Sequence, residues 1–545
     1  MRPASVDGTG EEVRVLTVMP GLGERNLEAV LRTGAAEYPD RLAVRDRQAA
    51  FSYGELWEDC LRAAGGFAAL GVGRQDPVLL MLDNHIDFVR VWLGLVGGGG
   101  VEVPVNTAYL GSILSYVINQ SGARVMVVED RYLPRLLDVA SDLVGLETVV
   151  VRGRAPDGPL AWRTVALDEV LAGRAIDPVH LDPWDLHGIM YTSGTTGQSK
   201  GVRVTHAHAY GYASPSAYGV ATADDVAVVA LPLFHIGGQW AGVYNALIAG
   251  GSAAVLDGFS ASKFWDDIRA YGCTVGLLLG AMADFLIRQP QRLDDADNPF
   301  RVAVVVPLGA EPQVFAERFG VQVCTAYGST EASAVIASGL ERVVPRSCGI
   351  IRDGFDARLV DVNDLEVPVG QVGELVVRSR EPWMLMDGYH QMPDATVRAW
   401  RNLWFHTGDA FYRDESGTFF FVDRLKDAIR RRGENVSSFE VEAEISHHPA
   451  VAECAVVGVE SEHSEQEIKA SVVLQPGAEL SGEDLIGFLT GRLPYFMVPR
   501  YIEFRDELPK TPTQKIRKEA LRAAGTEGNF DAVAAGVAPA RDTAR

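Results

Sequence analysis

Short apolar runs that alternate with helical stretches restrict the fold of this chain more than any other feature of its sequence. A capping-box pair, Ser52 with Glu55, opens an amphipathic helix that we expect to end near Leu70, and a second helix is expected at 88–95. Apolar runs of strand length recur along the chain, at 78–82, 101–105, 125–128, 148–151, 186–191, 226–231, 253–256, 275–279, 302–306 and 321–324. Strands separated by helices predict an α/β fold of layered, largely parallel sheets.

The chain is long enough for more than one domain. With 545 residues, of which 47% are hydrophobic, it can bury at least one large core. A charge-dense stretch at 423–435 is typical of a hinge between a large domain and a small one. We expect a flexible tail at 1–24, a large domain of layered α/β sheets at 25–424, a small α+β domain at 425–524 and a flexible tail at 525–545.

Composition argues against several classes of function. The net charge of -22 disfavours nucleic acid as a partner, because phosphate backbones select for clustered lysine and arginine. The five cysteines show no C-x-x-C spacing, so neither a disulfide framework nor a zinc site is expected. The N-terminus lacks the pattern of a signal peptide, and no apolar run reaches about 18 residues, so we expect no membrane span and a cytoplasmic protein.

A glycine- and hydroxyl-rich loop at 191–201, with the sequence YTSGTTGQSKG, has the composition of a polyphosphate site. Its glycines allow the backbone to approach an anion, its hydroxyls and N–H groups can donate to phosphate oxygens, and its lysine adds a positive charge. The spacing differs from G-x-x-x-x-G-K-[ST], and a flexible surface linker is the alternative. We expect the loop to follow a strand and to precede a helix that begins at His206. The candidate phosphate ligands are Thr192, Ser193, Gly194, Thr195, Thr196, Gly197 and Lys200.

Ligands in α/β folds gather beyond the carboxyl ends of the strands, so polar clusters at those ends are candidates for the site. His235 follows the run at 226–231 and lies among apolar residues and glycines, where a core histidine is the alternative. The segment Pro307 to Pro312, which contains Gly309, Ala310 and Glu311, is typical of a strand-to-helix turn.

Two further clusters follow later strands. Tyr327, beside Gly328, offers a flat face for a purine, while Thr330 can donate to phosphate and Glu331 can bind magnesium. The alternative for this cluster is the capped start of a helix. Asp409 could accept hydrogen bonds from two ribose hydroxyls or could be a turn aspartate, and a hairpin is expected directly after it, at 411–422.

Six motifs in this order resemble the adenylate-forming superfamily of acyl- and aryl-CoA synthetases, nonribosomal peptide adenylation domains and beetle luciferases. They are YTSGTTGQSKG, LPLFHIGG, TAYGSTE, FHTGD, DRLKDAIRRRGENVSSFEVE and PKTPTQK, and the match covers roughly 25–522. The chain is most similar to the crotonobetaine or carnitine CoA ligase branch of bacterial acyl-CoA synthetases. The resemblance implies an acyl-CoA synthetase-like fold, in which 25–424 is the adenylation domain and 425–524 is a mobile lid.

The resemblance also implies roles for single residues. The loop would hold the β- and γ-phosphates of ATP, Tyr327 would stack on adenine and Thr330 would touch the α-phosphate. Glu331 would bind Mg²⁺, with Thr192 as a second candidate ligand. Lys515 would reach the carboxylate and the α-phosphate during adenylation. Other positions on the nucleotide and coenzyme A side are Gly309, Ala310, Glu311, Gly328, Asp409, Arg424, Lys426, Arg430 and Gly433.

Within that set, Asp409 and Arg424 would hold the ribose, and the small domain would rotate about Lys426. The face carrying 430–433 would then replace Lys515, and coenzyme A would enter near Gly433. His235, with 278–281 and 309–310, would line the acyl pocket. The small residues Gly237, Gly238, Gly280, Ala281, Gly309 and Ala310 favour room for a bulky acid.

The implied reaction is ATP-dependent ligation of a carboxylic acid to coenzyme A, through an acyl-adenylate, in fatty acid or secondary metabolism. One alternative keeps the adenylate and passes the acyl group to an amine or to a carrier protein. Gln514 stands where most members have glycine, so a second alternative is an enzyme that performs only the thioester step on a supplied acyl-adenylate. A third is a nucleotide-binding protein without catalysis. A homodimer is expected only because homodimers are common.

Overall fold

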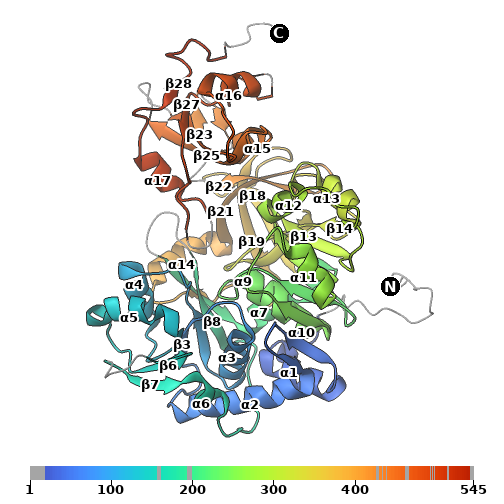
Figure 1. Cartoon of the computed structure of the whole chain (residues 1–545), viewed down its shortest axis with the longest axis vertical. Coiled ribbons are helices and arrows are strands. Elements are labelled where there is room, and N and C mark those ends of the chain that lie inside the picture. The colour runs from blue at the N-terminus through green and yellow to red at the C-terminus, as the bar shows by residue number, and fades with distance from the viewer. Residues whose placement is uncertain are drawn as a thin grey trace, which may run out of the picture.

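The computed structural model describes residues 19–155, 161–192, 199–424, 429–431, 434–436, 438–460, 466–490, 492–493, 495, 497–511 and 515–539. A large body contains two wide sheets, and a smaller C-terminal body lies at one end of it (Figure 1). Within these residues, no helix is long and apolar enough to cross a membrane. The predicted mixed α/β fold with a small C-terminal domain is therefore confirmed.

The first wide sheet has eight strands and carries the candidate phosphate loop near one edge. Six neighbouring strands, from β8 to β7, run parallel, whereas β9 and β20 are antiparallel to their neighbours. In spatial order the strands are β20 (Gly388–Tyr389), β9 (Lys200–Thr205), β8 (Leu186–Thr192), β4 (Val101–Pro104), β3 (Pro77–Met81), β5 (Val125–Glu129), β6 (Thr148–Arg152) and β7 (Arg163–Ala166).

The second wide sheet has seven strands and is parallel except for its edge strand β2. Its five strands between residues 226 and 324 were predicted from the sequence, with end points within two residues of those observed, whereas the two strands before residue 53 were not predicted. In spatial order they are β14 (Gln322–Cys324), β13 (Val302–Val306), β12 (Val275–Leu279), β10 (Val226–Val229), β11 (Ser252–Val255), β1 (Leu42–Arg45) and β2 (Ala50–Ser52).

Helices fill the space between the wide sheets and cover their outer faces. The predicted capping box opens α2 (Tyr53–Ala69), which packs on α3 (Ile86–Gly97). The inner layer continues with α7 (His206–Ala213), α9 (Ile236–Gly238), the π-helix η4 (Gln239–Tyr244) and α10 (Asn245–Ala249). The outer faces carry α4 (Gly111–Ser121) and α5 (Leu133–Asp138) on one sheet and α11 (Phe264–Tyr271), α12 (Gly280–Ile287) and α13 (Pro312–Phe319) on the other.

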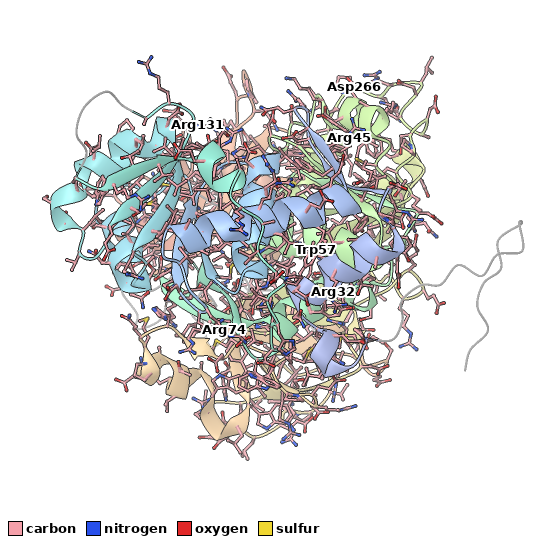
Figure 2. The ribbon with its side chains drawn as sticks, turned by 90° about the horizontal axis from the view of Figure 1, so that it is seen from below. Arg32, Arg45, Trp57, Arg74, Arg131 and Asp266 are labelled. Carbon is pink, nitrogen blue, oxygen red and sulfur yellow. The ribbon has the colours of Figure 1, made fainter. Side chains whose placement is uncertain are left out.

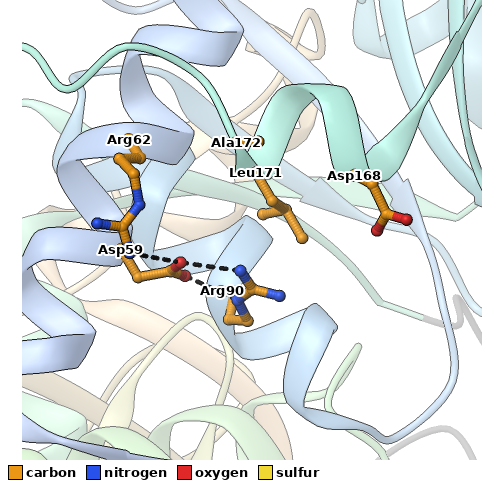
Figure 3. A pocket seen from close by; sticks show the side chains of 6 residues that line it. All are labelled: Asp59, Arg62, Arg90, Asp168, Leu171 and Ala172. Atoms are coloured by element: carbon orange, nitrogen blue, oxygen red, sulfur yellow. Dashed lines mark hydrogen bonds and ion pairs between the residues drawn. The ribbon is translucent and has the colours of Figure 1, made fainter.

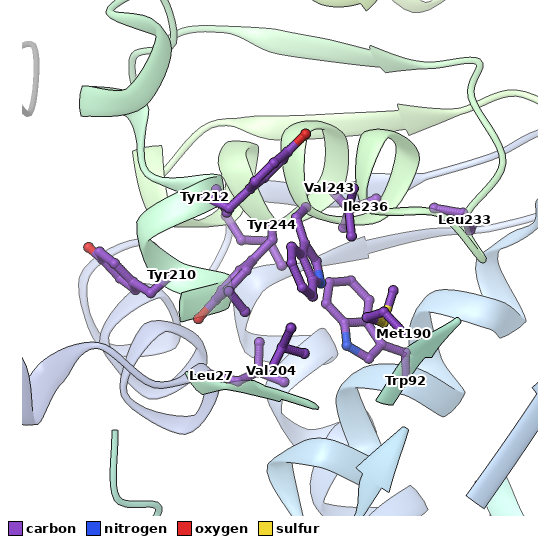
Figure 4. Packing of buried hydrophobic residues seen from close by; sticks show 14 of the residues in the cluster. Leu27, Trp92, Met190, Val204, Tyr210, Tyr212, Leu233, Ile236, Val243 and Tyr244 are labelled. Atoms are coloured by element: carbon purple, nitrogen blue, oxygen red, sulfur yellow. The ribbon is translucent and has the colours of Figure 1, made fainter. Parts of the chain in front are cut away.

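The main core lies between the two sheets, where large aromatic side chains are fully buried. Trp92 meets Tyr244 edge to face at 6.1 Å, and Figure 4 shows both packed with Met190, Ile236 and Val243. Each such side chain stabilises the fold by about 1.5–3 kcal/mol through burial, so this layer holds the two sheets in a fixed relation. The candidate residues at the strand ends are mounted on that rigid frame.

Two antiparallel sheets join the wide sheets to the small body. One contains β15 (Ala326–Ser329), β16 (Ser333–Ala337) and β17 (Ile350–Ile351). The other contains β18 (Phe355–Val360), β19 (Gly373–Ser379), β21 (Phe405–Arg413) and β22 (Phe419–Arg424), so the hairpin expected at 411–422 is confirmed as β21–β22.

The small body contains a four-stranded sheet, β25 (Val451–Glu460), β26 (Gln466–Leu474), β27 (Tyr501–Phe504) and β28 (Phe530–Asp531), and the pair β23 (Ile429–Arg431) and β24 (Glu434–Val436). Its helices are α15 (Ser438–Ser446), α16 (Gly482–Leu489) and α17 (Lys518–Ala523). Strand β28 lies in the expected C-terminal tail, yet it pairs with β27 and Ala532 is fully buried. The expectation of a flexible tail is corrected for 525–539, because Phe530 and Ala532 pack on this core.

The underside of the large body carries arginines that are paired with carboxylates (Figure 2). Arg32 lies 2.8 Å from Glu28 and Arg131 lies 2.8 Å from Glu129, while the guanidinium of Arg45 lies over the ring of Tyr271 at 4.8 Å. The positive charge on this face is therefore largely balanced by neighbouring groups.

Candidate functional site

Three candidate residues, one each from β15, β21 and β22, meet in space. The hydroxyl of Tyr327 donates to Oδ2 of Asp409 at 2.6 Å, and Nε of Arg424 lies 3.6 Å from Oδ1 of the same carboxylate. Asp409 and Arg424 are directly opposite each other in the antiparallel pair β21–β22. The sheet register therefore brings an aromatic ring, a carboxylate and a guanidinium together, as the nucleotide site requires.

The environment of Asp409 sets its protonation. Burial raises the pKa of this carboxyl group, while the hydrogen bond from Tyr327 and the charge of Arg424 lower it in part. Asp409 lies inside β21, so the alternative of a turn aspartate is wrong. A buried carboxylate with two such partners is held in one orientation.

Glu331 lies in the turn that joins β15 to β16, and its backbone carbonyl accepts from the N–H of Met386 at 2.9 Å. The capped-helix alternative for this segment is wrong. Ser333 adopts φ of 66°, which turns the chain back into an antiparallel strand where a helix would continue. Thr330 is buried in the same turn.

Tyr389, which the sequence did not single out, contacts two candidate residues. Its hydroxyl donates to Oε1 of Glu331 at 3.2 Å, and Nζ of Lys200 lies 4.7 Å from the centre of its ring. Among the described residues, Oε2 of Glu331 has no hydrogen-bond partner, which leaves it available to a cation. Lys200 and Glu331, far apart in the sequence, are thus linked through one tyrosine.

The candidate phosphate loop closes a β-hairpin. Thr192 and Lys200 are partners at the open end of the pair β8–β9, and Oγ1 of Thr192 donates to the carbonyl of Lys200 at 3.5 Å. The predicted helix after the loop is confirmed as α7, which begins at His206, but a strand that was not predicted separates the two. Ser193, Gly194, Thr195, Thr196 and Gly197 lie outside the described residues.

Lys515 brings the small body to this site. Its backbone N–H donates to Oγ1 of Thr511 at 3.1 Å, and the residue as a whole is exposed, although protein atoms surround its ammonium group. The protein atoms around the ammonium lower the pKa of Lys515, and so does the charge of Arg424, while Glu331 and Asp409 raise it. The lysine therefore lies within electrostatic reach of the nucleotide candidates.

His235 caps the short helix α9, where its Nδ1 accepts from the N–H of Gly237 at 3.2 Å. Burial and, to a smaller extent, the charge of Lys515 together lower the pKa of His235 to about 4. The imidazole is half-buried and uncharged near neutral pH, and the charge of Lys515 acts on it. His235 is hydrogen-bonded, as expected for a core histidine, and it also borders the site.

The small residues expected to open an acyl pocket differ in their surroundings. A Cβ on Gly309 would meet no atom within 4 Å, whereas a Cβ on Gly238 or Gly280 would lie 2.5 Å or 2.7 Å from a backbone oxygen. Gly238 and Gly280 are therefore small because backbone approaches them closely, which corrects the expectation that they open the pocket. The strand-to-helix turn that contains Gly309, Ala310 and Glu311 is confirmed between β13 and α13.

The remaining candidates belong to the small-domain side. Lys426 and Gly433, together with Gln514, lie outside the described residues, and for Arg430 only the backbone, in β23, is described. Their roles stay predictions.

The pocket in Figure 3 lies apart from these residues, on α2, α3 and α6 (Leu167–Leu171). Both of its guanidinium groups bond to the carboxylate of Asp59, which lies 2.7 Å from Nε of Arg90 and 3.3 Å from Nη2 of Arg62. A site whose guanidinium groups are already paired offers little to an anionic ligand. We therefore place the chemistry at the cluster that contains Tyr327, Glu331 and Asp409, where Oε2 of Glu331 has no hydrogen-bond partner among the described residues.

The donor set at the strand ends fits a nucleoside triphosphate with a divalent cation. Lys200, Arg424 and Lys515 supply positive charge for phosphates, and Glu331 supplies a carboxylate oxygen, the ligand type that Mg²⁺ prefers. Tyr327 supplies an aromatic face, packed edge-on against Phe411 at 4.8 Å. These residues could hold the triphosphate, the cation and the base at once.

Comparison with known proteins agrees with this geometry. Residues 31–390 match the family described as AMP-binding enzyme, and 440–515 match the AMP-binding enzyme C-terminal domain. A crotonobetaine/carnitine--CoA ligase of Salmonella paratyphi B is 33% identical over 517 residues, which are 92% of this chain and 99% of that protein.

Solved structures of similar fold cover nearly the whole chain. An anthranilate CoA ligase in complex with anthranoyl-AMP superposes with a TM-score of 0.83 at 23% identity, over 92% of this chain and 97% of that one. ATP-bound MatB from Rhodopseudomonas palustris superposes with a TM-score of 0.80 at 27% identity, over 92% and 99%. The apo form of MatB superposes less well, with a TM-score of 0.69 at 28% identity over the same shares.

Proposed function

This chain belongs to the family of AMP-binding enzymes, and from that membership we propose how the described residues carry out its reaction. The protein is an AMP-forming acid:CoA ligase, which joins a carboxylic acid to coenzyme A through an acyl-adenylate. Its substrates are ATP, coenzyme A and a carboxylic acid. One observation carries the assignment of residues: Lys515 of the small body lies within electrostatic reach of Glu331, Asp409, Arg424 and His235 of the large one.

In the first step, a carboxylate oxygen of the acid attacks the α-phosphorus of ATP, and the bond to the β,γ-phosphate breaks to release pyrophosphate. Two anions must approach each other, so positive charge at the α-phosphate lowers the barrier. Lys515 supplies that charge, and Thr330 donates a hydrogen bond to the same phosphate. Glu331, with Thr192 as a second candidate ligand, would hold Mg²⁺, which offsets the charge of the phosphates.

The nucleotide is held by groups that the large body fixes in advance. Tyr327 stacks on adenine, Asp409 accepts from the ribose hydroxyls, and Arg424 supports the same carboxylate. Lys200 and the loop before it bind the β- and γ-phosphates. Gly309, which opens onto free space, and the adjoining Ala310 and Glu311 border the acyl and nucleotide groups. Preorganisation of this kind supplies much of the rate enhancement where no enzyme nucleophile takes part.

In the second step, the thiol of coenzyme A attacks the carbonyl carbon of the acyl-adenylate, the thiol proton leaves, and AMP departs with the electrons of the broken bond. We propose that the small body first rotates about Lys426, so that Arg430 and Gly433 replace Lys515 at the site. The better fit to ATP-bound than to apo MatB supports the view that the present arrangement is the one that forms the adenylate.

The reaction is tested with purified protein, Mg²⁺, ATP, coenzyme A and a library of carboxylic acids that includes carnitine and crotonobetaine, after the name of the Salmonella relative. We expect AMP, pyrophosphate and one or more acyl-CoA products by mass spectrometry. ADP as the product would contradict the proposal. Acyl amides formed from added amines, in place of thioesters, would move the acceptor from coenzyme A to an amine.

We further propose that the enzyme works in the cytoplasm as a homodimer. Light scattering of the purified protein and fractionation of cells that express it test the two statements separately. A monomer in solution would contradict the first prediction without affecting the ligase assignment.

A further inference from the structure

Tyr389 lies on a strand of two residues at the edge of the eight-stranded sheet. Strand β20 pairs antiparallel with β9, where Tyr389 is opposite Val202, and the N–H of Tyr389 donates to Oγ1 of Thr396 at 2.9 Å. The next residue, His390, donates its N–H to the carbonyl of Gly201 at 2.7 Å. These bonds fix the backbone of Tyr389 beside the strand that leaves the phosphate loop.

The side chain of Tyr389 contacts one group through its ring and another through its hydroxyl. The ammonium of Lys200 lies over the ring, 4.7 Å from its centre, which is the geometry of a cation–π interaction. The hydroxyl donates to Oε1 of Glu331 at 3.2 Å. Only 8% of the residue is exposed, so solvent competes weakly for either contact.

The hydroxyl is a permanent donor. A phenol hydroxyl has an ordinary pKa of about 10, so it remains a hydrogen-bond donor near neutral pH. Because it occupies Oε1, it fixes the plane of the Glu331 carboxylate and leaves Oε2 free. A hydrogen bond to a carboxylate that binds a metal tunes both its orientation and its affinity.

We propose that Tyr389 is a positioning residue that sets Lys200 and Glu331 relative to each other, so that the triphosphate and its divalent cation meet both groups in one arrangement. The ring places the lysine and the hydroxyl places the carboxylate. The inference rests on the proposed function, in which Lys200 binds phosphate and Glu331 binds Mg²⁺. It assigns a role to a residue outside the phosphate loop and outside the cluster around Tyr327.

Two variants separate the two contacts. Tyr389→Phe keeps the ring and loses the hydroxyl, so it should weaken cation binding by roughly 10- to 100-fold, the usual loss when a partner of a metal ligand is removed. Binding of metal-free ATP should change little. Tyr389→Leu loses the ring as well, so it should weaken metal-free ATP binding in addition. A merely structural role would lower both affinities together in either variant.

Binding is measured without turnover. Mn²⁺ replaces Mg²⁺, free Mn²⁺ is counted by electron paramagnetic resonance in the presence of a non-hydrolysable ATP analogue, and the analogue alone is titrated by calorimetry. Tyr271→Leu is the matched control, because Tyr271 carries the guanidinium of Arg45 over its ring at 4.8 Å on α11, away from the candidate residues. Thermal unfolding of each variant shows whether the fold is retained.

Glu331→Gln distinguishes failure of this inference from failure of the proposed function. If Glu331→Gln binds Mn²⁺ and analogue like the wild type, the proposed metal site itself is wrong. If Glu331→Gln loses Mn²⁺ while Tyr389→Phe stays within twofold of the wild type, the metal site stands and Tyr389 does not position it. Recovery of pyrophosphate release by Tyr389→Phe at high Mn²⁺, but not by Tyr389→Leu, would support separate roles for the hydroxyl, which positions Glu331, and the ring, which positions Lys200.

Discussion

The two bodies of the molecule supply the site in different ways. In the large body, the Tyr327 hydroxyl lies 2.6 Å from Asp409 and the Tyr389 hydroxyl lies 3.2 Å from Glu331, so side chains are fixed by direct hydrogen bonds. In the small body, Lys515 is exposed, and the described residues offer its ammonium no ion pair. One half of the site is preformed by direct hydrogen bonds, whereas among the described residues the Lys515 ammonium interacts with the other half through longer-range charge effects.

Contacts elsewhere between the bodies are also long. Nη1 of Arg288 lies 3.4 Å from the carbonyl of Val451, and Arg346 lies 3.4 Å from Glu444. Shorter bonds occur where the chain passes between the bodies, since the N–H of Ser438 lies 2.8 Å from Asp423. A small domain that is bonded firmly near the connection and loosely at the site can leave it and return, as two reactions at one site require.

The largest effect is expected when Lys515, the group that the small body contributes to the site, is removed. Lys515→Ala should lower adenylate formation by roughly 10²- to 10³-fold, about 3–4 kcal/mol, because a preorganised charge at the reacting phosphate is lost. Thioester formation from a synthetic acyl-adenylate should be nearly unchanged, because Lys515 leaves the site for that step. Pyrophosphate release and thioester formation are measured separately.

Lys510→Ala is the control for this variant, because Lys510 lies in the same segment and bonds to Glu453 at 2.6 Å. It should affect neither step strongly. Equal losses in both steps for Lys515→Ala would show that Lys515 does not leave the site between adenylate formation and thioester formation. A wild-type protein that releases no pyrophosphate with any acid, yet converts a supplied acyl-adenylate, would favour the enzyme of the single thioester step.

The preformed half is tested at Asp409. Asp409→Asn keeps the shape of the side chain and removes the charge that accepts from Tyr327 and attracts Arg424. Hydrogen bonds to charged groups contribute about 1.5–3 kcal/mol, so binding of ATP should weaken by roughly 10- to 100-fold. Calorimetry measures the affinity. Asp414→Asn, in the turn of the same hairpin, should leave it unchanged, and an unaltered affinity in Asp409→Asn would place the ribose elsewhere.

Local sequence patterns predicted the frame of the large body because its strands and helices are set by local apolar periodicity and capping. The capping box of Ser52 and Glu55 opens α2 where expected, and the turn before α13 follows its strand as predicted. Strand β9 was missed because Lys200 and Gly201 belong to a loop motif by composition, and only pairing with β8 makes them part of a strand.

The site was predictable where a motif carries its own chemistry and unpredictable where contacts depend on distant pairing. Tyr327 and Asp409 were identified from their neighbours in the sequence, and the structure brings them together. Tyr389 was missed because its strand has two residues and its role arises from register with β9. The hairpin whose turn contains Glu331 was not predicted, and a helix start was the alternative considered, because the positive φ of Ser333 has no signature in its local sequence.

The electrostatic link between the two halves can be measured at His235. Burial, followed by the charge of Lys515, lowers the pKa of this imidazole from 6.5 to about 4. The folded state disfavours the proton, so the contribution of the neutral imidazole to folding stability is full above pH 6.5 and is lost as the pH falls through about 4. Lys515→Ala should therefore raise the pKa of His235, by less than burial lowers it. Titration of ¹³C-labelled histidine by NMR measures the shift, and Lys510→Ala should not reproduce it.

The smallest effect is expected at the contact between Arg346 and Glu444, which joins the bodies away from the reacting groups. The pair is 3.4 Å long and the Arg346 side chain is 46% exposed, so its contribution should not exceed about 1 kcal/mol, a factor of roughly five. Arg346→Gln should lower adenylate formation by up to that factor and leave the thioester step unchanged or faster, because the docked arrangement becomes less populated. Raised salt should have the same effect on the wild type and little further effect on the variant. Arg292→Gln, which breaks an exposed pair with Asp294 within the large body, should change neither step. A loss of adenylate formation of tenfold or more in Arg346→Gln would mean that fixed contacts hold the small body in place. The contrast between a preformed half of the site and a half that docks and leaves would then be wrong.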